Sequence, residues 1–155
     1  MKTLEYLIRP TPKSIDFVKR SIKERLNIAD ENLLHQIEMV ICELLENSVK
    51  YCPPENNNQD IELQFINDDK TIKIIVTNNI KSTDDRKNIE ETIGKIKSSP
   101  DSNNLYVERI REILNAKEHG KSQMGLYRIV YEGEFEITYS IDDDKLSITA
   151  VKSLI

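Results

Sequence analysis

The sequence predicts an α+β fold, a two-layer sandwich in which helices cover one face of a mixed, mostly antiparallel sheet. The prediction rests on three observations. Apolar and polar residues alternate in several short segments, as in strands with one buried face. Apolar residues recur three and four positions apart in longer segments, which is typical of amphipathic helices. Most of the strand segments form pairs joined by a short polar turn, and such hairpins favour antiparallel pairing with the helices on one side.

The first strand is predicted over residues 4–8, where apolar side chains alternate with polar ones. Pro10 and Pro12 end this strand. Ser14 is the predicted N-cap of the first helix, because a serine hydroxyl can accept a hydrogen bond from the first turn. The inner stripe of that helix consists of Ile15, Val18, Ile22 and Leu26.

The second helix is predicted from about Glu31 to about Tyr51, with Asp30 as its N-cap. Pro53 and Pro54 end it, because proline cannot continue a helix. Its inner stripe consists of Leu34, Ile37, Ile41, Leu44 and Ser48. This is the most strongly patterned element of the chain.

Two hairpins complete the predicted sheet. The first joins the alternating segments 61–65 and 72–76 through a turn at 67–70, and the second joins 135–141 and 146–150 through a turn at 142–144. Between the hairpins, apolar spacing predicts one helix at Ile89, Ile93 and Ile96 and another at Tyr106, Ile110 and Ile113. A short helix from Leu126 to about Tyr131 follows.

Length and composition predict a single globular domain over residues 1–155. The chain has 155 residues, 38% hydrophobic and 32% charged, and a formal net charge of −5. An acidic chain disfavours general binding to nucleic acid or to an anionic membrane. Cys42 and Cys52 provide no disulfide framework or metal-ligand pattern. Neither a signal peptide nor an apolar run long enough to span a membrane is visible, so the expected location is the cytoplasm.

A carboxylate, a carboxamide and an ammonium group lie close together on the second helix, at Glu43, Asn47 and Lys50. At spacings of four and three residues, these side chains project from one helix face. A carboxylate can act as a general base, an amide oxygen can bind Mg²⁺, and a lysine can bind phosphate. The pattern is that of half a magnesium–nucleotide site. A solvated helix face explains Glu43 and Asn47 as well, and the helix dipole alone favours a cation at Lys50.

Two further positions are candidates for ligand contacts. Asn78 ends the second hairpin strand, where it could bond the edge of a purine or simply cap a turn. Gly125 and Leu126 open the short helix, where a glycine lets the backbone approach phosphate or serves only as a joint. Gly120-Lys121-Ser122 is not the end of a P-loop, because Asn115 replaces the required upstream glycine and a helix is predicted before it.

Taken in order, these motifs resemble a known family. Glu43-x-x-x-Asn47-x-x-Lys50-Tyr51 on a helix, a polar strand end, and Gly125-Leu126 before a final hairpin are similar to the GHKL ATP-binding domain of gyrase, Hsp90, histidine kinases and MutL. Within that family, the chain most resembles anti-sigma-factor serine kinases and SiaB-like degenerate kinase-domain regulators. The segment 124–133 followed by a hairpin carries the second likeness.

The resemblance implies a Bergerat-type ATP-binding fold with ATP and Mg²⁺ as cofactors. It implies that Glu43 is the general base, that Asn47 binds magnesium and that Lys50 lies near the phosphates. Asn78 corresponds to the residue that reads the adenine amino group, and Gly125 and Leu126 lie beside the phosphates. The implied role is that of a bacterial partner-switching regulator, a serine/threonine kinase acting on a small STAS-type antagonist or sigma-like factor. A homodimer is a further expectation.

Two departures from the family pattern leave a second hypothesis open. Asn78 stands where the family has an aspartate, and an uncharged amide makes a weaker bond than a carboxylate. Ile80 stands where the family has a glycine, which removes the close backbone approach that glycine permits. The alternative is therefore a non-catalytic pseudo-kinase module that sequesters a partner protein.

Overall fold

The strands of the chain form one sheet with the order β1-β2-β3-β5-β4. The structure is a computed structural model that describes residues 1–52, 60–98, 107–108 and 124–155. The strands are β1 (Lys2–Ile8), β2 (Ile61–Asn67), β3 (Thr71–Asn79), β4 (Glu136–Asp142) and β5 (Lys145–Ser153). The described helices are α1 (Pro12–Arg25), α2 (Glu31–Tyr51), α3 (Thr83–Ser98) and α5 (Met124–Tyr131).

Every strand pair in the described sheet is antiparallel. The predicted α+β two-layer class is confirmed, and the sheet is more regular than the mixed arrangement that we expected. Both predicted hairpins are present, β2–β3 and β4–β5. The chain order does not continue across the sheet, because β5 and not β4 pairs with β3. The central strand β3 therefore joins the two hairpins.

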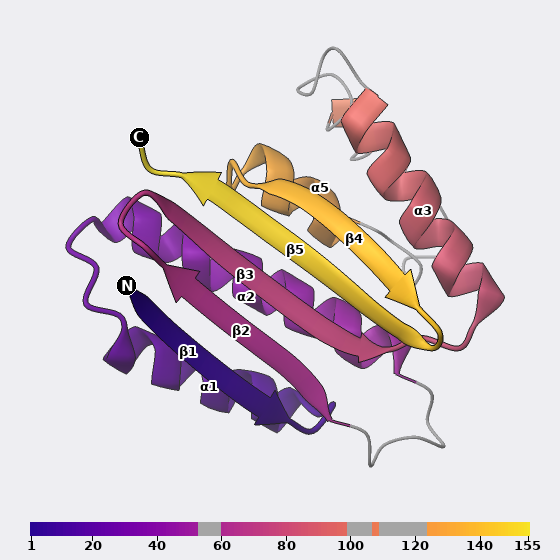
Figure 1. The fold of residues 1–155 in the computed structure, drawn as a ribbon, viewed down its shortest axis with the longest axis horizontal. Coiled ribbons are helices and arrows are strands. Elements are labelled where there is room, and N and C mark those ends of the chain that lie inside the picture. Colours follow the sequence, from indigo (N-terminus) through magenta and orange to yellow (C-terminus); the bar gives the residue numbers. More distant parts are fainter. Residues whose placement is uncertain (53–59, 99–106, 109–123) are drawn as a thin grey trace.

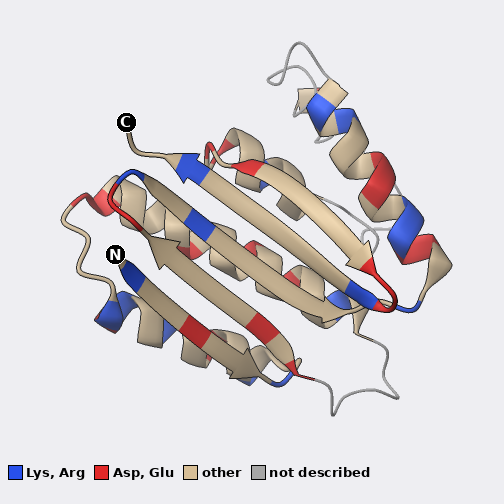
Figure 2. Cartoon of the chain, in the orientation of Figure 1, with Lys and Arg blue, Asp and Glu red and all other residues tan. Residues whose placement is uncertain are grey.

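The helices α1, α2 and α5 lie behind the sheet in Figure 1, and α3 lies beyond the β4 edge and contacts α5. Among the described residues, no helix lies over the opposite face of the sheet. Figure 2 shows that charged residues on the strands are few and that α3 carries both signs of charge. The core lies between α1, α2, α5 and the inner face of the sheet. Its fully buried members include Val18, Ile22, Ile41, Leu45, Leu63, Phe65, Ile74 and Ile129.

The N-terminus of α1 differs from the prediction. Thr11, and not Ser14, is the N-cap: the Thr11 side chain accepts a hydrogen bond from the Ser14 backbone N–H. Pro12 is the first helical residue instead of the end of the strand segment. Proline suits that position because its ring fixes φ and the N–H that it lacks would have no partner in the helix.

The second helix is confirmed in its bounds and in its cap. Asp30 Oδ1 accepts from the backbone N–H groups of Asn32 at 3.0 Å and Leu33 at 3.2 Å. This helix lies against β3, α1 and α5, so it forms the spine of the helical layer. All three residues of the predicted motif, Glu43, Asn47 and Lys50, lie in this helix.

The helix α5 packs against α2, and α3 packs against α5. The predicted helix at Ile89, Ile93 and Ile96 is α3, which begins at Thr83. The short helix α5 begins at Met124, two residues before the predicted start, so Gly125 lies inside the helix. The predicted helix around Tyr106, Ile110 and Ile113 lies outside the described residues apart from positions 107 and 108, which are helical. Within the described part of the chain, no helix has both the length and the apolar character that a membrane span requires.

Candidate functional site

Glu43 contacts the last helix through an ion pair. Its Oε1 lies 2.5 Å from Nη1 of Arg128, and the Nε of Arg128 lies 3.0 Å from Oε2 of Glu132, the residue that follows α5. The Glu43 side chain is only 14% exposed, whereas that of Arg128 is 40% exposed. The carboxylate predicted as a general base is therefore shielded from solvent and shares one guanidinium with a second carboxylate.

The environment of Glu43 shifts its proton affinity. Burial raises the pKa of Glu43 above its ordinary value, and this effect outweighs the attraction of Arg128, which lowers the pKa. The neighbouring carboxylates of Glu46 and Glu132 raise the pKa further. A carboxylate with a raised pKa is a stronger base, which is the property that a catalytic proton acceptor needs.

Asn47 lies one helical turn from Glu43 and is 8% exposed. Its amide nitrogen is buried and has no hydrogen-bond partner among the described residues. A buried N–H donor without a partner costs about 1–3 kcal/mol, and an acceptor such as a ligand oxygen or a water molecule would remove that cost. The sequence spacing predicted that Asn47 lies on the same helix face as Glu43, but it did not predict that the side chain is buried.

Asn78 is bonded inside the protein. Its Oδ1 lies 3.0 Å from the Ser48 hydroxyl, which donates either to it or to the Leu44 carbonyl oxygen, and its Nδ2 donates to the Asn79 carbonyl oxygen at 2.8 Å. The side chain is 4% exposed. The structure thus joins the end of β3 to the motif helix, and the amide predicted to read a purine already has partners at both ends.

Ile80, which follows the end of β3, is held in place as well. Ile80 is fully buried, and its N–H donates to the Asp144 carbonyl oxygen at 2.7 Å. Arg86 from α3 donates through Nη2 to the carbonyl oxygens of Ile80 and Asp143, each at 2.9 Å, and to the Asp144 carboxylate at 3.0 Å. Arg86 therefore connects the end of β3 to the β4–β5 turn. Nothing in the sequence pattern indicated this role.

Lys50 and Glu43 line two different hollows. The hollow at Lys50 has a volume of about 530 Å³ and lies between the end of α2 and the start of α3. Its lining includes the carboxylates of Asp84, Asp85 and Glu91 as well as Lys87. Burial raises the pKa of Asp85, and the charge of Lys50 opposes that shift. The acidic lining disfavours a triphosphate close to Lys50 in this arrangement.

Gly125 and Leu126 have separate roles. A Cβ atom on Gly125 would lie 2.5 Å from Oε2 of Glu43, so glycine is what allows α5 to approach the carboxylate. Leu126 is fully buried and its side chain belongs to the core. The structure therefore brings Gly125 against Glu43, with Asn47 one turn away on the same helix, while Lys50 lines a separate hollow.

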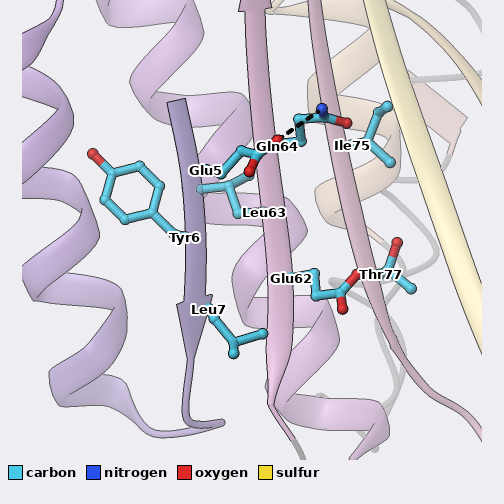
Figure 3. A pocket seen from close by; sticks show the side chains of 8 residues that line it. All are labelled: Glu5, Tyr6, Leu7, Glu62, Leu63, Gln64, Ile75 and Thr77. Atoms are coloured by element: carbon cyan, nitrogen blue, oxygen red, sulfur yellow. Dashed lines mark hydrogen bonds between the residues drawn. The ribbon is translucent and has the colours of Figure 1, made fainter. Parts of the chain in front are cut away.

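A further hollow lies on the uncovered face of the sheet, far from the motif. It has a volume of about 420 Å³ over β1, β2 and β3, with Glu5, Leu7, Glu62 and Gln64 among its lining residues (Figure 3). Gln64 donates to Glu5 across the two strands at 3.3 Å. None of the predicted site residues lines it.

The described residues fit the magnesium part of a magnesium–nucleotide ligand better than its purine part. They contain no group of three His, Cys, Asp or Glu side chains that could hold a metal ion alone. Mg²⁺ bound with a nucleotide needs only one or two protein ligands, because phosphates and water supply the others, so buried Asn47 fits that half. The purine half fits less well, since Asn78 is already bonded and Ile80 is buried.

Comparison with known proteins shows the fold. No protein-family model matches the chain, and no curated protein matches it. Among solved structures, a chain of the SiaB–SiaC complex from Pseudomonas aeruginosa matches with a TM-score of 0.72 and 17% sequence identity. The match covers 96% of this chain and 89% of that chain. The whole domain, rather than one motif, therefore has the fold of a chain in that complex.

Proposed function

We propose that this protein is a signalling regulator of the partner-switching type, which binds a small regulatory protein of the STAS type. We further propose that it transfers phosphate from ATP to a serine or threonine of that partner. Two things support the proposal: the fold is shared with a chain of the SiaB–SiaC complex, and Glu43 lies against Gly125 with Asn47 one helical turn further along α2. The single observation that carries it is the position of the nearly buried Asn47 side chain, one helical turn from the shielded carboxylate of Glu43.

In this proposal, each side chain has one task. Glu43 accepts the proton of the partner's hydroxyl as that oxygen forms its bond to phosphorus and ADP leaves. Asn47 holds magnesium through its side-chain oxygen, and the N-terminal turn of α5 at Gly125 lies next to the transferred group. ATP with Mg²⁺, when bound, supplies the phosphoryl group and neutralises the charge that develops during transfer.

The first test is a calorimetric titration of the protein with ATP, with and without Mg²⁺. The proposal requires binding that depends on magnesium and is lost in Asn47→Ala. Glu43→Gln serves as the matched control, because it removes the base but keeps the shape of the site. We expect Glu43→Gln to bind ATP and to lose transfer of ³²P from ATP to STAS-type proteins offered singly. Equal transfer by Glu43→Gln and the unchanged protein would contradict the role of Glu43 as the base.

A non-catalytic binding module is the second candidate. The bonds of Asn78 to Ser48 and Asn79, together with the burial of Ile80, favour it because they occupy the purine side of the site. In that case the protein would act by sequestering its partner, with no chemistry. Absence of ATP binding at millimolar concentration, with intact binding of a STAS-type partner, is the result that this candidate predicts. Magnesium-dependent ATP binding would exclude it.

A further inference from the structure

The Arg128 side chain is shared by two carboxylates of different exposure. Nη1 contacts Glu43, which is 14% exposed, and Nε contacts Glu132, which is 42% exposed. Glu132 lies four residues after Arg128, so the second pair joins the last turn of α5 to the residue that follows the helix. A guanidinium presents several N–H donors in a fixed plane, and it can therefore bridge two acceptors at once.

Gly125 brings the backbone of α5 against the same carboxylate. Its would-be Cβ lies 2.5 Å from Oε2 of Glu43, while Oε1 faces Arg128. One helix therefore contacts both oxygens of Glu43, one through a glycine and one through a cation. In this arrangement Oε1 is paired with the guanidinium and is not open to a hydroxyl proton.

Arg128 can be reached from outside the core. A hollow of about 270 Å³ lies between α1, α2 and α5, and Glu43 and Arg128 are among its lining residues. Besides Glu43, the charged and titratable groups that face this region are Lys19 of α1, His35, Glu38, Cys42 and Glu46 of α2, Arg128 of α5 and Glu132 just after α5. A ligand with an acidic group in this hollow would meet the guanidinium before it reached Glu43.

We propose that Arg128 is a positioning residue that controls whether Glu43 is available as a proton acceptor. Paired with Glu43, Arg128 occupies the oxygen that would take the proton. Drawn toward an acidic group in the hollow, Arg128 releases that oxygen. The control of catalysis by Arg128 rests on the proposed kinase function, but its control of Glu43 can be measured without it. No atom is transferred in this step, since only the partner of the guanidinium changes.

The test compares Arg128→Met and Glu132→Gln, which change the two sides of the shared pair. Arg128→Met keeps the length of the side chain but removes the cation, so the pKa of Glu43 should rise. Glu132→Gln removes the competing acceptor and a nearby negative charge, so the pKa should fall. The measurement is a ¹³C NMR titration of the Glu43 carboxyl carbon in the full chain, assigned by loss of its signal in Glu43→Gln. Shifts in opposite directions support the proposal, and unchanged values in both variants overturn it.

Turnover of ATP with Mg²⁺ then separates the new inference from the proposed function. We expect Arg128→Met to raise basal turnover and Glu132→Gln to lower it, within the roughly 10²–10⁴-fold that a general base contributes. If Arg128→Met loses turnover and Arg128→Lys restores it, Arg128 binds phosphate and the inference is overturned while the kinase function stands. If no variant binds ATP, the kinase function fails, and the opposite NMR shifts alone decide whether Arg128 controls Glu43.

Discussion

Replacement of Gly125 by alanine tests the contact on which the candidate site depends. The added Cβ would lie 2.5 Å from Oε2 of Glu43, and real Cβ contacts essentially never fall below 3.0 Å. The nearest atom is the end of a flexible side chain, so Glu43 would rotate away rather than α5 shift as a whole. That rotation would break the 2.5 Å contact between Glu43 and Arg128.

The size of the effect follows from two opposing contributions. Alanine in place of a helical glycine gains roughly 0.5–1 kcal/mol. The lost ion pair costs about 0.2–1 kcal/mol, a range measured for pairs that remain partly exposed, as Arg128 is. Gly125→Ala should therefore leave the free energy of unfolding nearly unchanged. Gly94→Ala is the matched control, because Gly94 also lies in a helix and a Cβ there meets nothing within 4 Å. It should gain the full amount.

Thermal and urea unfolding of both variants measure this difference. For a domain of this size, about 1 kcal/mol corresponds to a change in Tm of roughly 2–4 °C, so the two variants are distinguishable. In an Arg128→Met background the ion pair is already absent, and Gly125→Ala should then gain as much as Gly94→Ala. An equal gain by both variants in the unchanged protein would refute the close approach of α5 to Glu43.

The remaining predictions concern packing and protonation. Gly133→Ala should destabilise the fold by about 1–3 kcal/mol, because its Cβ would lie 2.7 Å from a backbone oxygen of α5, and urea unfolding beside Gly94→Ala measures this. Phe65→Ala should cost about 3–5 kcal/mol, since that ring is fully buried, whereas Phe17→Ala, at a 62% exposed position, should cost far less; similar losses would contradict the core assignment. Because burial raises the folded-state pKa of Glu43 above 4.5, the native state retains a proton that the unfolded chain releases, so this contribution to stability is complete below pH 4.5 and is lost as the pH rises through the raised value. The stability of Glu43→Gln relative to the unchanged protein should therefore grow over that interval, and a constant difference would be inconsistent with the raised pKa.

Much of the fold could be predicted because local chemistry dictates it. Asp30 caps α2 as expected, since its carboxylate lies before a long apolar stripe and accepts from the first-turn N–H groups. The predicted cap of α1 was wrong by three residues, because Thr11 and Ser14 have the same capping chemistry. Pro12 suits the first helical position, which makes Thr11 the cap. The strand order could not be derived, since alternation predicts that a strand has one buried face but does not predict its neighbour in the sheet.

In the candidate site, too, local relations could be predicted and long-range contacts could not. Helical spacing placed Glu43 and Asn47 on one face, because that relation is local to α2. The bond between Ser48 and Asn78 joins residues 30 positions apart, and the contact of Arg128 with Glu43 joins residues 85 positions apart. Such pairs depend on how the elements pack. An arginine within the largely apolar segment 124–131 was the one available indication that α5 presents a charge toward α2.

The pairing of β3 with β5 has a consequence for the order of folding. Its register joins Thr71 to Ser153 and Asn79 to Lys145, so the central seam of the sheet connects distant parts of the chain. The cost of closing such a loop is paid before the pairing repays it, which slows folding relative to a chain of local contacts. During synthesis β3 would emerge with one edge unpaired until β5 follows, and in that interval its exposed edge is a place where a nascent chain could associate wrongly.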